Sequence, residues 1–253
     1  MQLDEFFEKN KITGVTGNSG AGKSTFMSEF KLSKQCGVVN NDIIKCNIVK
    51  DQIEYFVREY NYRLKELSDR ENEIIAMLDI DKSILDESIY DISESELSKV
   101  LIASVMLYNP EVMVFDEVLY PLDFVEKTKL LKLLIKLKKF FKKTIIIVSS
   151  NIDDIYEFID NVIIIDNGKV LLHGDKYDVY SNYDLIKEKN IRIPSIVTFI
   201  KMMRNKGINV DNVDTINELI KTVYREMRWL VWDIRLLLVM MDLSLMVIKN
   251  KRE

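Results

Sequence analysis

The sequence has few residues of the kinds that build tight turns or cross-links. Among its 253 residues are 8 glycines, 3 prolines and 2 cysteines. The shortage of turn residues argues against a turn-rich all-β fold, and an apolar content of 47% argues against disorder, so helices are favoured. Cys36 and Cys46 have no second cysteine pair, which argues against a zinc site or a disulfide framework and is typical of a reducing cytosol.

An excess of one charge is also lacking. The formal net charge is -4, with acidic and basic residues interspersed. Dedicated nucleic-acid-binding domains carry a basic excess, so we expect no nucleic-acid partner. His173 is the single histidine, and a histidine metal site is not expected. The sequence opens Met-Gln-Leu-Asp-Glu, without a basic segment followed by an apolar one, so we expect no signal peptide.

Short apolar runs alternate with helical patterns in the first part of the chain. This alternation predicts an α/β fold with a mostly parallel sheet covered on both faces. Asn167-Gly168 is typical of a hairpin turn. The predicted strands are 11–16, 37–40, 112–115, 144–148 and 162–165, and the predicted helices are 24–34, 51–80, 93–108, 122–142 and 153–159.

The composition changes after about Tyr180, where only helical patterns remain. We therefore predict an α/β domain at residues 1–178, with a helical subdomain at about 50–108. Residues 179–253 are predicted to form a C-terminal helical region for dimerisation or docking.

The stretch 229–248 is mostly apolar and long enough to span a membrane. Asp233, Arg235 and Asp242 interrupt it, and each costs roughly 2.5–3.5 kcal/mol near a bilayer centre. The apolar residues between them follow the spacing of a packed helical seam. We favour docking or dimerisation and expect no transmembrane span; a buried core helix is a third interpretation.

The strongest motif lies between the first predicted strand and the first predicted helix. Residues 17–25 read GNSGAGKST and fit G-x-x-x-x-G-K-[ST]. Backbone N–H groups of such a loop point at phosphate oxygens, helped by the helix N-terminus. We predict that Lys23 reaches the β- and γ-phosphates of ATP and that the Ser24 hydroxyl binds Mg²⁺. The predicted nucleotide-binding residues here are Gly17, Asn18, Ser19, Gly20, Ala21, Gly22, Lys23, Ser24 and Thr25.

Two carboxylates follow the strand predicted at 112–115. In P-loop nucleotide hydrolases an Asp at such a strand end holds Mg²⁺, and the next Glu orients the attacking water or accepts its proton. An acidic pair at a strand end is a weak signal alone but a strong one beside a phosphate loop. We predict Asp116 as a magnesium ligand and Glu117, with Lys23, as catalytic.

Together these segments resemble ATP-binding cassette (ABC) ATPases. Residues 92–123 align without gaps with the family's signature helix, N-P turn, second acidic motif and D-loop, and 116–123, DEVLYPLD, are similar to D-E-P-T-S-A-L-D. Residues 144–151 resemble the strand that precedes the family's switch histidine, and 160–174 resemble the segment after it. The resemblance covers about 11–175 and implies a P-loop nucleotide hydrolase fold.

Within that family, residues 193–219 are similar to the tail of energy-coupling-factor ATPases, including cobalt and vitamin importer cassettes. This resemblance implies a head-to-tail dimer in which ATP lies between one phosphate loop and the other subunit's signature helix. ATP then favours the closed state. It also implies two partners, a second cassette (the same or a different chain) and a membrane coupling or permease protein, at the cytoplasmic periphery of the cell membrane.

The signature departs from the family's L-S-G-G-Q. Ile92 is conservative, Ser93 is kept and Glu96 also occurs in relatives, but Glu94 and Ser95 replace the glycine pair. A β-carbon at Ser95 crowds the approach to the γ-phosphate, and Glu94 repels it. We expect the chain to serve poorly as the signature donor to a partner's ATP.

Two other motif residues are replaced. Ser150 stands at the switch histidine, and a hydroxyl lacks the charge-capable ring of that residue. Asn41 stands at the Q-loop glutamine, one methylene shorter, and Asp42 follows it as an acid of unassigned role. We include Asn41 and Ser150 among the nucleotide-site residues. His173 is interpreted as a core or surface residue, not as a substitute switch.

The segment before residues 11–16 leaves little room for the family's N-terminal strands and its adenine-stacking aromatic residue. Phe6 or Phe7 is the available substitute, although a core role is favoured for both. We predict a trimmed N-terminal β-subdomain and weaker selectivity for adenine.

The favoured function is the ATP-binding subunit of an energy-coupling-factor-like importer, which binds Mg-ATP and hydrolyses it slowly or only with a partner cassette. The alternative is an ABC-type nucleotide-sensing module in which ATP drives dimerisation. A third function, on ribosomes or DNA, is disfavoured by the charge balance. Tyr55, Phe56, Tyr60 and Tyr62 fit either a contact with a membrane partner or a helical core face.

Overall fold

The computed structural model describes residues 6–28, 35–60 and 67–227. The chain divides into two compact units, Met1–Pro194 and Ser195–Glu253, which are described in turn. The division predicted between residues 178 and 179 stays a prediction.

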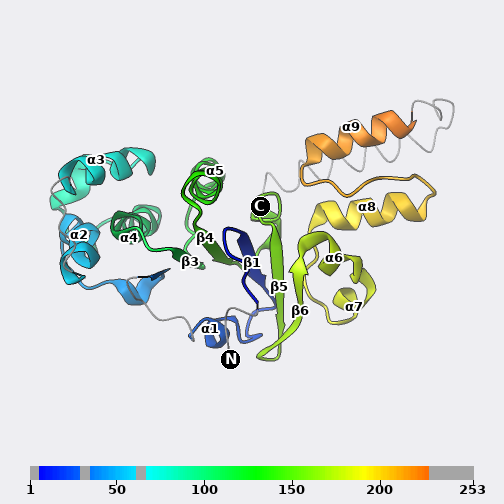
Figure 1. The fold of residues 1–253 in the computed structure, drawn as a ribbon, viewed down its shortest axis with the longest axis horizontal. Helices are drawn as coiled ribbons and strands as arrows, with labels where there is room; N and C mark the ends of the chain where they lie inside the picture. Colours follow the sequence, from blue (N-terminus) through cyan, green and yellow to red (C-terminus); the bar gives the residue numbers. More distant parts are fainter. Residues whose placement is uncertain (1–5, 29–34, 61–66, 228–253) are drawn as a thin grey trace. The chain divides into compact units, whose positions relative to one another are not determined.

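The first unit is built on a six-stranded sheet with the order β2-β3-β4-β1-β5-β6 (Figure 1). Its neighbouring strands are parallel, apart from β5 and β6, which form an antiparallel hairpin. The predicted mostly parallel sheet is therefore confirmed. The strands are β1 (Ile12–Thr16), β2 (Cys36–Val39), β3 (Val112–Asp116), β4 (Thr144–Val148), β5 (Asn161–Asp166) and β6 (Lys169–Asp175).

The central strands are buried because nearly all of their residues are apolar. Every residue of β1 and β4 is buried, whereas the edge strand β6 is partly exposed. Parallel strands that are covered on both faces need continuous apolar runs instead of alternating ones. Since β3, β4 and β1 are adjacent and parallel, their carboxyl ends meet at one edge of the sheet, where ligands bind in open α/β folds.

Helices and short 3-10 turns connect the strands. α4 packs against α2, α3 and β2, and α5 packs against β4. The helices are α1 (Lys23–Met27), α2 (Val49–Glu59), α3 (Leu67–Met77), α4 (Glu94–Tyr108), α5 (Phe124–Phe141), α6 (Lys176–Ser181) and α7 (Tyr183–Glu188), and the turns are η2 (Asn41–Ile43), η3 (Lys82–Asp86) and η4 (Ile152–Asp154).

The group α2, α3 and α4 forms the helical part of the first unit (Figure 1). Phe56 in α2 and Tyr60, the residue that caps this helix, pack against α4. Phe56 is 1% exposed, and its ring lies 5.6 Å from that of Tyr108 in α4. The ring of Tyr60 lies 5.4 Å from the same tyrosine. Of the two interpretations of these aromatics, the helical core face applies to Phe56 and Tyr60, while Tyr62 lies outside the described residues.

Both long helices of this unit begin with a capping box. Ser93 caps α4 together with Glu96, and Asp123 caps α5 together with Glu126. In each box the cap side chain accepts a bond from the third helical N–H, and the glutamate accepts one from the N–H of the cap residue. The capping boxes set where both helices begin: α4 starts one residue after its predicted start at 93, and α5 starts two residues after its predicted start at 122.

The second unit contains α8 (Ser195–Asn205) and α9 (Ile216–Met227). Its core joins one face of each helix to the segment between them, through Phe199, Ile200, Met203, Val210, Leu219 and Val223. Arg204 ties that segment down by donating to the carbonyl oxygen of Val210 from Nε at 2.9 Å.

Some predicted helices are corrected. Residues 153–159 do not form an α-helix: η4 and turns occupy them, in the connection that leads from β4 past β1 to β5. The helix predicted at 51–80 is two helices, α2 and α3. The helix predicted at 24–34 is described only as α1, since 29–34 lie outside the described residues, as does 229–248. Within the described residues, no helix is long and apolar enough to cross a membrane.

Candidate nucleotide-binding site

The loop between β1 and α1 depends on glycine at two positions. A β-carbon on Gly17 would lie 2.3 Å from the carbonyl oxygen of Ile165. Gly22 has a φ of 92°, and a β-carbon there would lie 2.7 Å from the Cα of Gly168. The Gly168 N–H donates to the carbonyl oxygen of Ala21 at 2.7 Å. The β5–β6 hairpin therefore holds the loop closely, and only glycine fits at the two ends.

Lys23 folds back over this loop. Its side chain is 8% exposed, and Nζ donates to the carbonyl oxygens of Gly17 and Asn18 at 3.0 and 3.3 Å. Nζ also lies 4.0 Å from Oε1 of Glu117. The ammonium group is thus held at the mouth of the loop, where it can neutralise a phosphate. Ser24 and Thr25, next in α1, are exposed.

Asp116 and Glu117 lie beside Lys23 at the carboxyl end of β3. Burial raises the pKa of Asp116, and the charge of Glu117 raises it further, while Lys23 lowers it. Glu117 has a φ of 55°, a left-handed conformation that few residues with a β-carbon adopt. Its backbone N–H still donates to the carbonyl oxygen of Val148 on β4 at 3.2 Å. This turn directs the carboxylate toward the phosphate loop.

Ser150 lies two residues beyond β4 and contacts Glu117. Its hydroxyl donates to Oε1 of Glu117 at 2.6 Å, and its N–H donates to Oε2 at 3.4 Å. The sequence marked Ser150 as the replacement for a histidine and missed this contact. The sequence predicts strands at 112–115 and 144–148 but not that they are neighbours in the sheet, so it holds no local signal for this contact.

Asn41 and Asp42 lie in η2, after β2, and both are exposed. The side chain of Asn40 accepts a hydrogen bond from the Asp42 N–H at 3.1 Å. The charge of Asp42 also contributes to raising the pKa of Asp116. The charge of Asp42 therefore acts on Asp116, whereas Asn41 begins the turn and its carbonyl oxygen accepts from the N–H of Ile44 at 3.3 Å.

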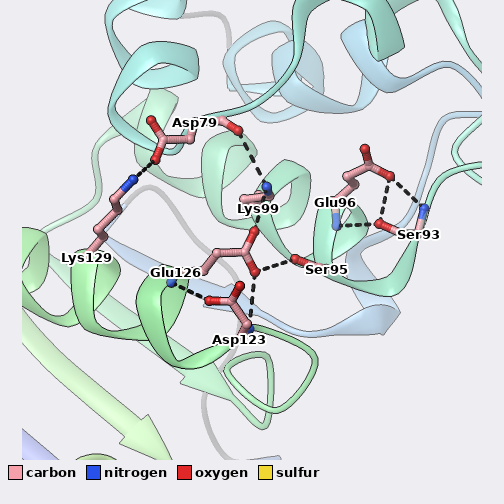
Figure 2. Close-up of polar contacts among 8 residues, drawn as sticks. All are labelled: Asp79, Ser93, Ser95, Glu96, Lys99, Asp123, Glu126 and Lys129. Atoms are coloured by element: carbon pink, nitrogen blue, oxygen red, sulfur yellow. Dashed lines mark hydrogen bonds and ion pairs between the residues drawn. The ribbon is translucent and has the colours of Figure 1, made fainter.

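The segment 92–96, predicted to be an altered signature, forms the start of α4 (Figure 2). The hydroxyl and N–H of Ser93 donate to Oε2 of Glu96 at 2.7 and 2.8 Å, which lowers the pKa of Glu96. The Ser95 hydroxyl donates to Oε2 of Glu126 in α5 at 2.8 Å. Two of the altered positions therefore engage groups of the same chain.

Phe6 and Phe7 pack against the core of the first unit. The ring of Phe6 lies 5.0 Å from that of His173 and 6.2 Å from that of Phe26, both edge to face. His173 in β6 is thus an aromatic neighbour of Phe6. This contact fits the interpretation of His173 as a core or surface residue. These contacts agree with the core role favoured for the two phenylalanines.

The loop between β1 and α1 is rich in glycine, a buried lysine lies over it, and two carboxylates stand at the end of a nearby parallel strand. This arrangement is typical of the phosphate site of P-loop nucleotide-binding proteins. The family model described as "ABC transporter" matches residues 2–119. Residues 2–119 are therefore similar to the ABC transporter family, and the predicted resemblance to ABC ATPases is confirmed.

Curated proteins of similar sequence include energy-coupling factor transporter ATP-binding proteins EcfA2. One from Mycoplasmoides gallisepticum is 26% identical over 236 residues, covering 78% of this chain and 74% of its own length. One from Clostridium perfringens is 27% identical over 243 residues, covering 83% and 85%. This chain is thus similar in sequence to the energy-coupling-factor branch.

Solved structures of similar fold are ABC cassettes. The dimeric MJ0796, a bacterial ABC transporter cassette, matches with a TM-score of 0.59 and 20% identity, over 67% of this chain and 87% of that one. The cbiO1 protein of Clostridium perfringens, part of the ABC transporter complex cbiONQ, matches with a TM-score of 0.57 and 23% identity, over 77% and 89%. These matches show that the fold is that of an ABC cassette.

Proposed function

We propose that this chain is the ATP-binding subunit of an energy-coupling-factor-like importer and that it binds Mg-ATP at residues 17–25. The observation that carries the proposal is the position of Lys23, buried over the phosphate loop and 4.0 Å from Glu117. An ammonium group held by backbone carbonyls at a glycine loop is suited to the charge of a polyphosphate. The curated relatives support the importer assignment.

The acidic residues of the site suit a magnesium ion. Burial and the neighbouring charges of Glu117 and Asp42 raise the pKa of Asp116, and Lys23 offsets only part of this effect, so negative charge at Asp116 is unfavourable in the ligand-free site. A divalent cation relieves this repulsion, and Asp116 with the Ser24 hydroxyl would hold it. When bound, Mg²⁺ neutralises charge on the phosphate oxygens.

For hydrolysis, one residue of this chain accepts a proton from the attacking water, and a second residue positions the acceptor. Glu117 accepts the proton of the attacking water, and Ser150 fixes the carboxylate by donating to Oε1. Lys23 balances charge that develops on the phosphates. Ser150 can orient Glu117 but cannot carry the positive charge of an imidazolium, so we propose slow hydrolysis.

The altered signature argues for hydrolysis that depends on a partner. A carboxylate of the same chain already occupies the N-terminus of α4, because Glu96 accepts hydrogen bonds from the cap residue Ser93. Glu94 is a second acid in the same turn. A phosphate at this helix end meets two negative charges, so the segment is a weak donor to an ATP held by another cassette. Pairing with a cassette that has an intact signature supplies what this chain lacks.

A surface beside the site fits a second cassette as partner. Three large apolar side chains, Tyr120, Phe124 and Val125, are 83%, 80% and 58% exposed where the chain leaves the acidic pair and enters α5. Apolar residues grouped in this way are typical of a protein-binding surface. The membrane coupling protein and a peripheral cytoplasmic location are proposed from the relatives, and the alternative of a purely regulatory module is not favoured by them.

Affinity purification of the tagged full chain from detergent-solubilised membranes tests the assignment. We expect a second cassette and an integral membrane protein to co-purify. Tyr120→Glu should reduce recovery of the second cassette severalfold, while Phe140→Glu, also an exposed aromatic, in the last turn of α5, should not. Recovery of soluble proteins alone would overturn the importer function and favour regulation.

A further inference from the structure

Polar contacts among four residues join the start of α4 to the start of α5 (Figure 2). Glu126 is at the centre of this group. Its Oε2 accepts from the Ser95 hydroxyl at 2.8 Å and from the Asp123 N–H at 3.2 Å, and its Oε1 is 3.0 Å from Lys99 Nζ. The group Ser95, Lys99, Asp123 and Glu126 is called the α4–α5 clasp below.

The clasp is partly shielded from water. The side chains of Lys99 and Glu126 are 13% and 29% exposed. Burial alone would raise the pKa of Glu126, but hydrogen bonds from Ser95, Lys99 and the Asp123 N–H outweigh it and lower the pKa. Glu126 is therefore held as a carboxylate by donors from both helices. Lys129 and Asp79 form a second ion pair nearby. Both side chains are 61% exposed, so water screens the attraction between them.

The clasp joins two segments that matter to the proposed site. Ser95 belongs to the altered signature at the start of α4. Asp123 ends the loop 117–123, which begins at the proposed proton acceptor Glu117. One carboxylate, Glu126, bonds to both segments, so a displacement of the α4 start is transmitted to the loop behind Glu117.

We propose that Glu126 is a positioning residue, which with Ser95 and Lys99 fastens the signature end of α4 to the loop 117–123. The serine at the second glycine position of the signature is then a structural partner of α5, and not simply a loss. The clasp keeps the loop ordered, and the helical part and the loop respond to nucleotide together. The joint response to nucleotide rests on the proposed function, whereas the fastening of α4 to the loop 117–123 does not.

Hydrogen exchange by mass spectrometry on the full chain, with and without Mg-ATP, tests the clasp. Ser95→Ala and Lys99→Met each remove one donor and leave the capping box of α5 intact. Each should speed exchange of amides 118–124 in the ligand-free protein by about fivefold, because a charge-assisted bond no longer opposes local opening. Ser95→Thr keeps the hydroxyl and should restore the slow exchange.

Lys129→Ala is the matched control, since it removes an α5 lysine that bonds to Asp79 and not to Ser95 or Asp123. It should leave amides 118–124 at the wild-type rate. The proposal is overturned if Ser95→Ala and Lys99→Met do not change that rate, or if Lys129→Ala changes it equally. In wild type, Mg-ATP should slow exchange in residues 93–99 and 118–124 together, and the two responses should separate in Ser95→Ala.

The two proposals fail in different ways. If Mg-ATP does not slow exchange at residues 17–25 in the wild type, the ATP site is wrong, while the clasp is still judged from ligand-free exchange. If residues 17–25 respond but 118–124 do not depend on Ser95 or Lys99, the ATP site stands and the clasp is rejected.

Discussion

Replacing Ser150 by alanine removes the hydroxyl that holds the proposed proton acceptor. The bond from Ser150 to Oε1 of Glu117 is 2.6 Å long. A hydrogen bond to a charged group contributes about 1.5–3 kcal/mol. The Glu117 side chain is 42% exposed and Ser150 is exposed, so we take the low end, about 1.5 kcal/mol. We therefore expect turnover to fall about tenfold.

The assay is single-turnover hydrolysis of radiolabelled ATP with protein in excess over nucleotide, combined with equilibrium binding of Mg-ATP. The Kd should stay within about twofold, because Ser150 contacts the carboxylate and not the phosphate loop. Ser150→Thr keeps the hydroxyl and should retain the wild-type rate. Unchanged turnover in Ser150→Ala, or a loss of binding as large as the loss of rate, would refute the role given to this serine.

Three further predictions concern the same site. Glu117→Gln should abolish what slow turnover the purified chain has and leave Mg-ATP binding intact; brisk turnover of the isolated wild type would contradict the slow-hydrolysis proposal. Gly22→Ala should lower the free energy of unfolding by about 2–3 kcal/mol in urea titrations, because of its φ and its 2.7 Å approach to Gly168, whereas Gly20→Ala, with open space around it, should cost only about 1 kcal/mol. Asp116→Asn should raise stability by about 1 kcal/mol at pH 7. Since the pKa of Asp116 is raised in the folded state, its carboxylate destabilises the ligand-free protein above that pKa, and the gain should vanish as pH falls through it; an equal gain at pH 3 and pH 7 would be inconsistent with this.

The phosphate loop was predictable because its signals are local. Gly17 and Gly22 stand where the backbone passes close to the β5–β6 hairpin, and Lys23 follows directly, so one short motif sets conformation and charge together. The apolar runs of β1 and β4 likewise identify buried parallel strands.

The contacts that complete the site were not predictable in the same way. Ser150 and Glu117 are 33 residues apart, and Ser95 and Glu126 are 31 apart. Neither pair has a sequence pattern of its own, because the pairing depends on strand order and on how α4 meets α5. In the sequence, Ser95 and Ser150 are recognised only as replacements of motif residues. In the structure, each donates a hydrogen bond to a glutamate.

The helix predicted at 153–159 was wrong for a different reason. Its residues have helical spacing, but they belong to the connection that passes β1 on the way from β4 to β5, and there the chain forms η4 and turns. Tertiary constraint outweighed local preference there.

Isothermal titration of Mg-ATP into the purified full chain tests the central claim most directly. Wild type should bind one nucleotide per chain, and Lys23→Met should weaken binding about 30-fold or more, because it removes a charge-assisted contact to phosphate while its length preserves the packing. Circular dichroism should show the variant folded. No binding by wild type at millimolar Mg-ATP, or equal affinity in Lys23→Met, would contradict the assignment of residues 17–25 as the ATP site.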